Sequence, residues 1–136
     1  MYGLFGGGEV RDLTPEEVDD GVRAGEILLV DVREPNETAI ERIPGAVLLP
    51  LSTFDPAELP DAAGRALVFS CASGIRSIKA AEIAQAAGLP YNAHLAGGLK
   101  AWKAAGLVDI EHRAMSVGGG LVMWGRKAPP SPKPLS

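Results

Sequence analysis

Residues 66–77 read Ala66-Leu67-Val68-Phe69-Ser70-Cys71-Ala72-Ser73-Gly74-Ile75-Arg76-Ser77. The segment opens with a continuous apolar run, 66–69, which is typical of a strand buried on both faces of a parallel sheet. Helix-forming residues follow over 77–87. The residues spaced for one buried face of this helix are Ile78, Ala81, Ile83 and Ala84. The segment therefore predicts a buried strand, a short loop that carries the cysteine, and a helix.

The same alternation of strands and helices continues on both sides of this unit. Thr14-Pro15-Glu16-Glu17 combines a capping box with proline at the first helical position, which predicts a helix start. The predicted strands are 27–30, 46–49, 66–69 and 92–95, and the other predicted helices cover 36–42, 77–87 and 99–105. We therefore expect an α/β fold, with a mainly parallel central sheet of about five strands and helices on both faces.

The 136 residues suit a single domain, which most often has roughly 100–150 residues. Glycines in 1–9 predict a flexible N-terminal arm, and the strand–helix alternation places the domain at 10–107. Residues 108–136 form a predicted C-terminal extension that ends in a proline-rich stretch of low complexity. Its apolar segment Leu121–Trp124 either docks on the domain or on a partner, or belongs to a disordered tail.

Charge and composition exclude several classes of protein. The net charge of −4 repels a phosphate backbone, so we expect no nucleic-acid partner. A single cysteine cannot form an internal disulfide, and no apolar run approaches the ~20 residues of a membrane span. The N-terminus has no signal-peptide pattern, so we expect a cytoplasmic protein without membrane association. His94 and His112 lack ligand-like spacing with Cys71, and no metal site is expected.

The loop that carries Cys71 has features of a site for an anionic sulfur. A loop of this length between strand and helix can turn its backbone N–H groups inward, and the helix adds its positive N-terminal end. A cysteine there lies in a positive field, which lowers the thiol pKa and favours the thiolate or a persulfide anion. Gly74 permits an unusual backbone angle, and Arg76 adds positive charge near an anionic donor. The alternative is that Cys71 is only a small buried apolar residue.

Four segments, in this order, resemble motifs of the rhodanese domain family. Asp31-Val32-Arg33-Glu34 is similar to the family's DVRE strand end, and Ile43-Pro44-Gly45-Ala46 is similar to its H-I-P-G-A turn. Cys71–Ser77 is similar to its C-x-x-G-x-R-S active loop, and Gly97–Trp102 is similar to its GG-x-x-AW segment. Together the segments span residues 10–106, and the chain resembles a single-domain sulfurtransferase of the rhodanese type.

The resemblance implies sulfur transfer in two steps through Cys71. The thiolate takes a sulfane sulfur from a donor such as thiosulfate or a persulfide, and it passes this sulfur to cyanide, a thiol or a protein cysteine. The implied substrate-binding residues are those of the loop, Ala72, Ser73, Gly74, Ile75, Arg76 and Ser77. Their backbone N–H groups would hold the anionic sulfur. No metal or organic cofactor is implied.

Two positions depart from the family's pattern. Arg42 stands where the family commonly has histidine, and we expect this position to be structural rather than catalytic. Ala72 stands where some thiosulfate-using members carry a basic residue. A small persulfide or a protein donor is therefore an alternative to thiosulfate.

Asp31 and Arg33 are candidate supporting residues, because Asp31 follows a predicted strand at the edge where α/β proteins form their sites. The structural alternative pairs Arg33 with Glu34 or Glu37 and lets Asp31 cap the loop by hydrogen bonds.

Three other functions fit parts of the pattern. Cysteine-based phosphatases usually have one residue more between cysteine and arginine than the four that separate Cys71 from Arg76. The shorter loop suits one sulfur atom better than a tetrahedral oxyanion. A protein-partner sulfur carrier would share the persulfide chemistry and differ in its acceptor. A rhodanese-like binding or regulatory module typically lacks the cysteine, which is present here.

Overall fold

Five strands form one parallel sheet, in the order β1-β6-β5-β2-β4, in a computed structural model that describes residues 9–107 and 111–112. The strands of this sheet are β1 (Arg11–Leu13), β2 (Ile27–Asp31), β4 (Val47–Leu48), β5 (Ala66–Ser70) and β6 (Ala93–Leu95). The helices are α1 (Pro15–Arg23), α2 (Pro35–Thr38), α3 (Arg76–Ala86) and α4 (Gly98–Ala104), with 3-10 turns at Leu51–Thr53 and Pro56–Glu58. A separate antiparallel pair joins β3 (Glu41–Arg42) to β7 (Glu111–His112). The predicted α/β fold with a parallel central sheet is confirmed.

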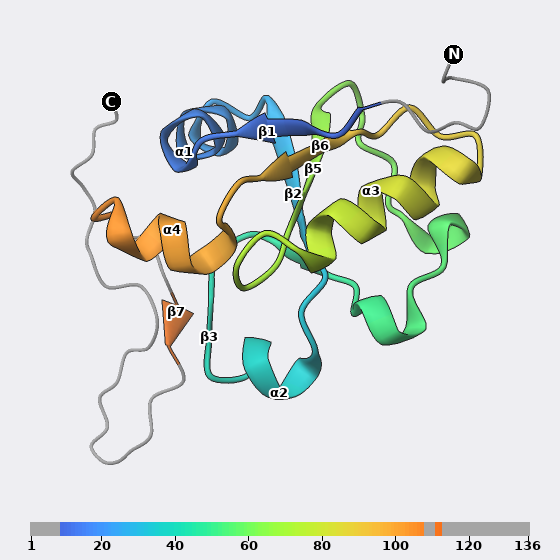
Figure 1. The fold of residues 1–136 in the computed structure, drawn as a ribbon. Coiled ribbons are helices and arrows are strands. Elements are labelled where there is room, and N and C mark those ends of the chain that lie inside the picture. Colours follow the sequence, from blue (N-terminus) through green and yellow to red (C-terminus); the bar gives the residue numbers. More distant parts are fainter. Residues whose placement is uncertain (1–8, 108–110, 113–136) are drawn as a thin grey trace.

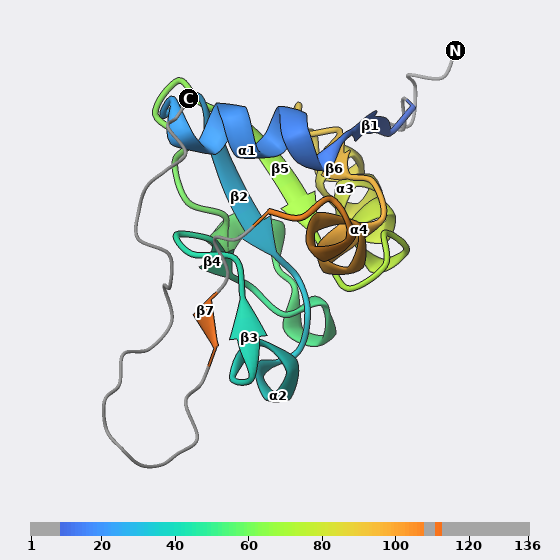
Figure 2. The same ribbon diagram turned by 90° about the vertical axis from the view of Figure 1, so that its left-hand side faces the viewer.

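Helices cover both faces of this sheet, with α3 on one side and with α1 and α4 on the other (Figures 1 and 2). Side chains alternate along the two central strands. Leu28 and Phe69 pack in the core beneath α3, whereas Leu29 and Val68 pack with α1 and α4. The central strands are therefore buried on both sides, which explains why their sequences are continuous apolar runs.

The chain reverses its direction of travel across the sheet between β2 and β5. From β2 the next strand of the sheet is added on one side, as β4, and from β5 it is added on the other side, as β6. In open α/β sheets, ligands bind outside the carboxyl ends of the strands at such a switch point. The turn after β2 and the loop after β5 therefore lie where this kind of fold forms its sites.

Two elements differ from the sequence prediction. The helix predicted over 36–42 is wrong in extent, because α2 ends at Thr38 and the backbone of Glu41 and Arg42 pairs with β7 instead. Strand β1 was not predicted, since its three residues, Arg11–Leu13, contain no apolar run. Within the described residues the strand lies at the edge of the sheet and pairs with β6 alone, so little apolar sequence is needed.

The buried face of α3 is rotated relative to the prediction. Ile78 is 36% exposed, whereas Ala80, Ala81 and Ala84 are fully buried. Ser77 is fully buried too, because its N–H and its hydroxyl both contact the Cys71 sulfur. These contacts hold the Ser77 side of the helix inward, so the alanines that share this side are buried and Ile78 turns outward.

The predicted division of the chain at residues 9/10 and 107/108 stays a prediction. The N-terminal arm before Glu9 and the segment Leu121–Trp124 lie outside the described residues. In the described ranges, 9–107 and 111–112, no helix is long and apolar enough to cross a membrane.

Helix α4 begins in direct contact with the loop that follows β5. The Leu99 N–H donates to the Cys71 carbonyl at 2.9 Å, and the Lys100 N–H donates to the Ala72 carbonyl at 3.0 Å. Gly98 has φ +60°, and a Cβ at this position would lie 2.7 Å from the carbonyl carbon of Ala72. Glycine is therefore required for this close approach.

We expect Gly98→Ala to lower the free energy of unfolding by at least about 2 kcal/mol, because a backbone clash adds to a strained left-handed conformation. Gly106→Ala is the matched control. Gly106 has φ +78° but open space beside its Cα, so its loss should be about 1 kcal/mol. Urea unfolding measures both values, and equal losses would contradict the close approach at Gly98.

Candidate active site

Cys71 is the first residue after β5, and it is 2% exposed. Its Sγ accepts hydrogen bonds from the N–H groups of Gly74, at 3.1 Å, and Ser77, at 3.3 Å. The Sγ atom also lies 3.5 Å from Ser77 Oγ. The loop therefore surrounds the sulfur with hydrogen-bond donors.

These hydrogen bonds favour the thiolate form of Cys71. Burial raises the pKa of the Cys71 thiol, but hydrogen bonds from Ser77, Gly74 and Ser73 outweigh burial and leave this pKa below its ordinary value. The Ser77 N–H belongs to the first turn of α3, which has no side-chain N-cap. The sulfur thus takes the place of the capping oxygen at the positive end of this helix.

Gly74 sets the curvature of the loop. It has φ +95°, and a Cβ on this residue would lie 2.8 Å from the backbone nitrogen of Gly97. A residue with a side chain would therefore push the loop away from the turn before α4. The absence of a side chain allows the loop to close and its N–H to reach the sulfur.

Arg76 forms a bidentate ion pair with Glu37 of α2, with distances of 2.8 Å and 2.9 Å between nitrogen and oxygen. The hydrogen bond from Arg76 lowers the pKa of Glu37 to about 2, and Glu37 raises the pKa of Arg76. The positive charge expected beside an anionic donor is therefore compensated by a carboxylate. The pair also ties α2 to the end of the active loop.

Asp31 and Arg33 form a buried ion pair at the end of β2, with Arg33 Nη2 lying 2.8 Å from Asp31 Oδ2. Asp31 Oδ1 also accepts from the Arg33 N–H at 3.0 Å, which confirms the predicted hydrogen-bonded cap. The partner of Arg33 is thus Asp31 rather than Glu34 or Glu37. Arg33 Nη2 further donates to the Glu41 carbonyl at 2.9 Å, so the pair fixes the path of the chain between β2 and β3.

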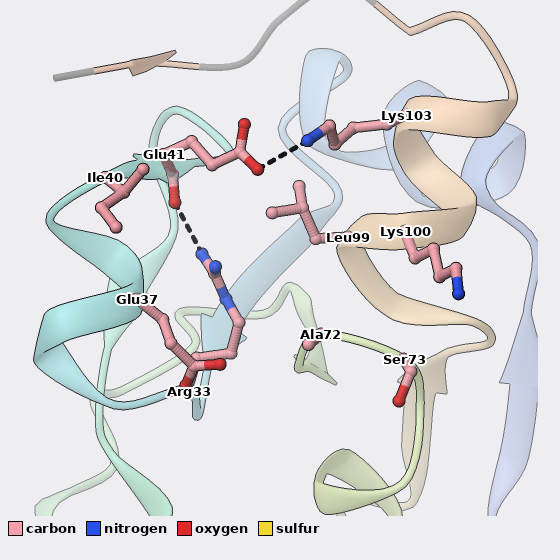
Figure 3. Close-up of a pocket in the computed structure, with 9 residues that line it drawn as sticks. All are labelled: Arg33, Glu37, Ile40, Glu41, Ala72, Ser73, Leu99, Lys100 and Lys103. Carbon is pink, nitrogen blue, oxygen red and sulfur yellow. Dashed lines mark hydrogen bonds and ion pairs between the residues drawn. The ribbon is translucent and has the colours of Figure 1, made fainter. Parts of the chain in front are cut away.

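A cavity of about 430 Å³ lies beside the active loop (Figure 3). Its lining residues are Arg33, Glu37, Ile40, Glu41, Ala72, Ser73, Leu99, Lys100 and Lys103. Lys103 pairs with the Glu41 carboxylate at 2.6 Å, and Glu37 pairs with Arg76. Within the part of the chain that the structure describes, the Lys100 ammonium has no carboxylate partner. Lys100 therefore contributes an uncompensated positive charge to the cavity wall.

A polar chain that the sequence did not reveal lies behind Cys71. Ser77 Oγ lies 2.8 Å from His94 Nδ1, and His94 Nε2 lies 2.7 Å from Asp12 Oδ1. His94 stands directly opposite Asp12 in the pairing of β6 with β1. The sequence feature that could have indicated this polar chain was a histidine, His94, inside a predicted strand. Its partners could not be found, because β1 was not predicted and the register between strands is not written in the sequence.

Two further expectations concern residues outside the loop. Arg42 lies in β3 and stands opposite Glu111 of β7, which places it in the small antiparallel pair rather than in the loop. Among the side chains that the structure describes, no group of three or more His, Cys, Asp or Glu could hold a metal ion.

The relationship of the chain to known proteins follows from a family model. The model described as "Rhodanese-like domain" matches residues 14–105. This protein belongs to the rhodanese-like family. The match includes the turn after β2, the loop at Cys71 and the start of α4. The family that the four motifs indicated is thus confirmed.

Several curated relatives are named for sulfur transfer. The chain is 41% identical over 108 residues to an uncharacterized protein of Synechocystis, which covers 73% of this chain and 60% of that protein. It is 38% identical over 95 residues to the probable adenylyltransferase/sulfurtransferase MoeZ of Mycobacterium tuberculosis. This match covers 66% of this chain and 24% of MoeZ. It is 33% identical over 94 residues to the thiosulfate:glutathione sulfurtransferase of Saccharomyces cerevisiae. This match covers 59% of this chain and 67% of the yeast protein. The aligned part therefore spans less than two thirds of the first two relatives.

Solved structures have the same rhodanese-like fold. A possible tyrosine phosphatase from Rhodopseudomonas palustris matches with a TM-score of 0.60 at 31% identity, covering 71% of this chain and 82% of that chain. A rhodanese-related protein from Thermoplasma volcanium matches with a TM-score of 0.58 at 26% identity, covering 71% of this chain and 93% of that chain.

We expect Glu37→Gln to reduce stability at neutral pH by about 0.5–1 kcal/mol, because its ion pair with Arg76 is partly exposed. The folded-state pKa of Glu37, about 2, lies below the ordinary value of 4.5. The ion pair therefore stabilises the fold above about pH 4.5, and this contribution is lost as the pH falls toward 2.

Urea unfolding of the wild type and of Glu37→Gln from neutral pH down to about pH 3 measures this effect. The difference between the two proteins should shrink as the pH falls. A difference that stays constant over this range would contradict a charge-dependent role of Glu37.

Proposed function

We propose that this protein is a sulfurtransferase in which Cys71 carries a sulfane sulfur as a persulfide. The observation that carries the proposal is the enclosure of a buried Sγ by the N–H groups of Gly74 and Ser77. The chain's only cysteine thus lies at the switch point of the sheet, in surroundings that favour its thiolate form. Relatives named as sulfurtransferases support the same chemistry.

In the first step, the Cys71 thiolate attacks the sulfane sulfur of the donor. A bond forms between Sγ and this sulfur, and the bond from the sulfane sulfur to the rest of the donor breaks. The leaving group departs with the electron pair, as sulfite from thiosulfate or as a thiolate from a small persulfide. The product on the protein is the Cys71 persulfide anion.

In the second step, an acceptor attacks the outer sulfur of the persulfide. Cyanide gives thiocyanate, and a thiolate gives a new persulfide. The bond between the two sulfurs of the persulfide breaks, and Cys71 Sγ leaves as the thiolate with the electron pair. The cycle needs no metal or organic cofactor, since both steps are displacements at sulfur.

Backbone groups of the loop suit the outer sulfur of the persulfide. The N–H groups of Ile75 and Arg76 have no acceptor among the described residues, while those of Gly74 and Ser77 bind Sγ. Successive N–H groups in such a loop make a small concave site for an anion. A second sulfur bonded to Sγ would therefore find donors without any rearrangement of the fold.

The adjacent cavity suits a small anionic donor or acceptor that has an apolar part. Lys100 supplies a positive charge, and Ile40 and Leu99 supply apolar surface. The relative in Saccharomyces cerevisiae is named for thiosulfate and glutathione, which are both anionic. Ala72 adds no charge of its own, so a small persulfide is as suitable a donor as thiosulfate. The Cys71 thiol and small thiols such as glutathione stay reduced in the cytoplasm. We therefore propose the cytoplasm as the compartment of this protein.

A protein acceptor is the second candidate. Ile75, at the end of the active loop, is 74% exposed, although it is a large apolar side chain. An apolar side chain beside the reactive sulfur suits contact with another protein. The relative MoeZ is named for both adenylyl and sulfur transfer, and this chain covers 24% of it. In this form of the proposal, a cysteine thiolate of a partner protein attacks the outer sulfur and becomes the persulfide, while Cys71 Sγ leaves as the thiolate.

We expect incubation with thiosulfate or with a small persulfide to add the mass of one sulfur atom to the wild-type protein. Cyanide should remove this mass, and Cys71→Ser should gain none, because no other cysteine is present. Intact-protein mass spectrometry measures both, and circular dichroism verifies the fold of the variant. A sulfur gain on Cys71→Ser, or no gain on the wild type with either donor, would refute the proposal.

The same preparation tests phosphatase activity, in view of the solved structure described as a possible tyrosine phosphatase. Four residues separate Cys71 from Arg76, and Arg76 is already paired with Glu37. We therefore expect no hydrolysis of an aryl phosphate above that of Cys71→Ser.

A further inference from the structure

Four side chains from four segments of the chain form a continuous polar chain behind Cys71. The distance from Cys71 Sγ to Ser77 Oγ is 3.5 Å, and the distance from Ser77 Oγ to His94 Nδ1 is 2.8 Å. His94 Nε2 lies 2.7 Å from Asp12 Oδ1. Ser77 is fully buried, the His94 side chain is 3% exposed, and the Asp12 side chain is 72% exposed. This polar chain of four side chains thus connects a buried sulfur with the protein surface.

The hydrogen positions in this chain follow from what each group can donate. A carboxylate only accepts, so His94 Nε2 carries a hydrogen that it donates to Asp12. In the neutral imidazole, Nδ1 then has a lone pair and accepts from the Ser77 hydroxyl. Because the Ser77 hydroxyl hydrogen is directed at His94, the Ser77 oxygen is left to accept from the neutral Cys71 thiol. The donors and acceptors are therefore arranged so that a proton can pass from Cys71 through Ser77 to His94.

We propose that His94 is a positioning residue that receives, through Ser77, the proton released when Cys71 becomes a thiolate. The inference rests on the proposed function of Cys71. The thiol proton passes to Ser77 Oγ while the Ser77 hydroxyl proton passes to His94 Nδ1. A neutral thiol and a neutral imidazole thereby become a thiolate and an imidazolium, with no net change of charge. The Asp12 carboxylate then faces a cation.

The two hydrogen bonds of Ser77 survive this transfer with their directions reversed, and His94 Nε2 still donates to Asp12. The Ser77 hydroxyl donates to the thiolate, and the His94 Nδ1–H donates to Ser77 Oγ. The proton stays inside the protein while the sulfur is anionic, so a sulfur that is 2% exposed needs no contact with water to ionise. A neutral acceptor side chain in place of His94 could bind Ser77 but could not store the proton.

Among the described residues, Asp12 is the charged side chain that hydrogen-bonds to His94. The sequence of β5 contains no charged residue, and Lys79 and Glu82 of α3 are exposed to solvent. Arg76 of α3 acts electrostatically on Cys71 but is paired with Glu37. In the cavity, the carboxylates of Glu37 and Glu41 both face cations. His94 is thus the group placed to hold the proton of Cys71.

The rate at which iodoacetamide alkylates Cys71, followed against pH by intact mass, tests this role without any sulfur donor. His94→Asn retains an amide oxygen that can accept from Ser77 but cannot bind a proton. We expect it to raise the pH midpoint of alkylation by about one unit, which is about a tenfold slower reaction near neutral pH. A histidine with a merely structural role predicts an unchanged midpoint.

Asp12→Asn provides a second test on the surface of the protein, where the substitution does not endanger folding. The amide can still accept from Nε2, but it no longer stabilises an imidazolium, so we expect alkylation about threefold slower near neutral pH. Asp20→Asn, which makes the same charge change at an exposed position of α1, should leave the profile unchanged. If His94→Asn does not fold, the comparison of Asp12→Asn with Asp20→Asn decides alone.

The two proposals fail separately in this experiment. Wild-type profiles in His94→Asn and Asp12→Asn would overturn the role of His94, while persulfide formation on Cys71 could still occur. Conversely, shifted profiles without sulfur gain on the wild type would support the proton path and refute sulfur transfer. Shifted profiles together with sulfur gain support both.

Discussion

The hydrogen bonds from the N–H groups of Gly74 and Ser77 to the Cys71 sulfur are the contacts on which the site depends. A sulfur that is 2% exposed would remain a neutral thiol if burial acted alone. The donors reverse this preference, because each of them points at the atom where the negative charge resides. In a Cys71 persulfide the negative charge would lie on the outer sulfur, for which the N–H groups of Ile75 and Arg76 are the proposed donors.

The rest of the fold holds these donors in place. The first turn of α4 binds the carbonyls of Cys71 and Ala72, which turns the N–H groups of the loop toward the sulfur. The Arg76–Glu37 pair fixes the far end of the loop to α2. The parallel sheet brings the end of β2 next to the end of β5, where the cavity opens. The site is thus a product of strand order as much as of loop sequence.

The sequence predicted the parts of the fold that depend on local pattern. The apolar runs at 27–30 and 66–69 lie in the central strands, because burial on both faces requires an unbroken run. Parts that depend on tertiary contacts were missed. Strand β1 has no apolar run, and the rotation of α3 follows from the contacts of Ser77. The link from His94 to Asp12 requires the register of two strands far apart in the sequence.

We propose that the loop after β5 binds an anionic sulfur atom carried by Cys71. A crystal structure of the protein after loading with a sulfur donor would reveal where this atom lies. We expect a second sulfur bonded to Cys71 Sγ and within hydrogen-bonding distance of the N–H groups of Ile75 and Arg76. Loaded protein in which the outer sulfur points away from the loop, or in which Cys71 Sγ has left the N–H groups of Gly74 and Ser77, would contradict it.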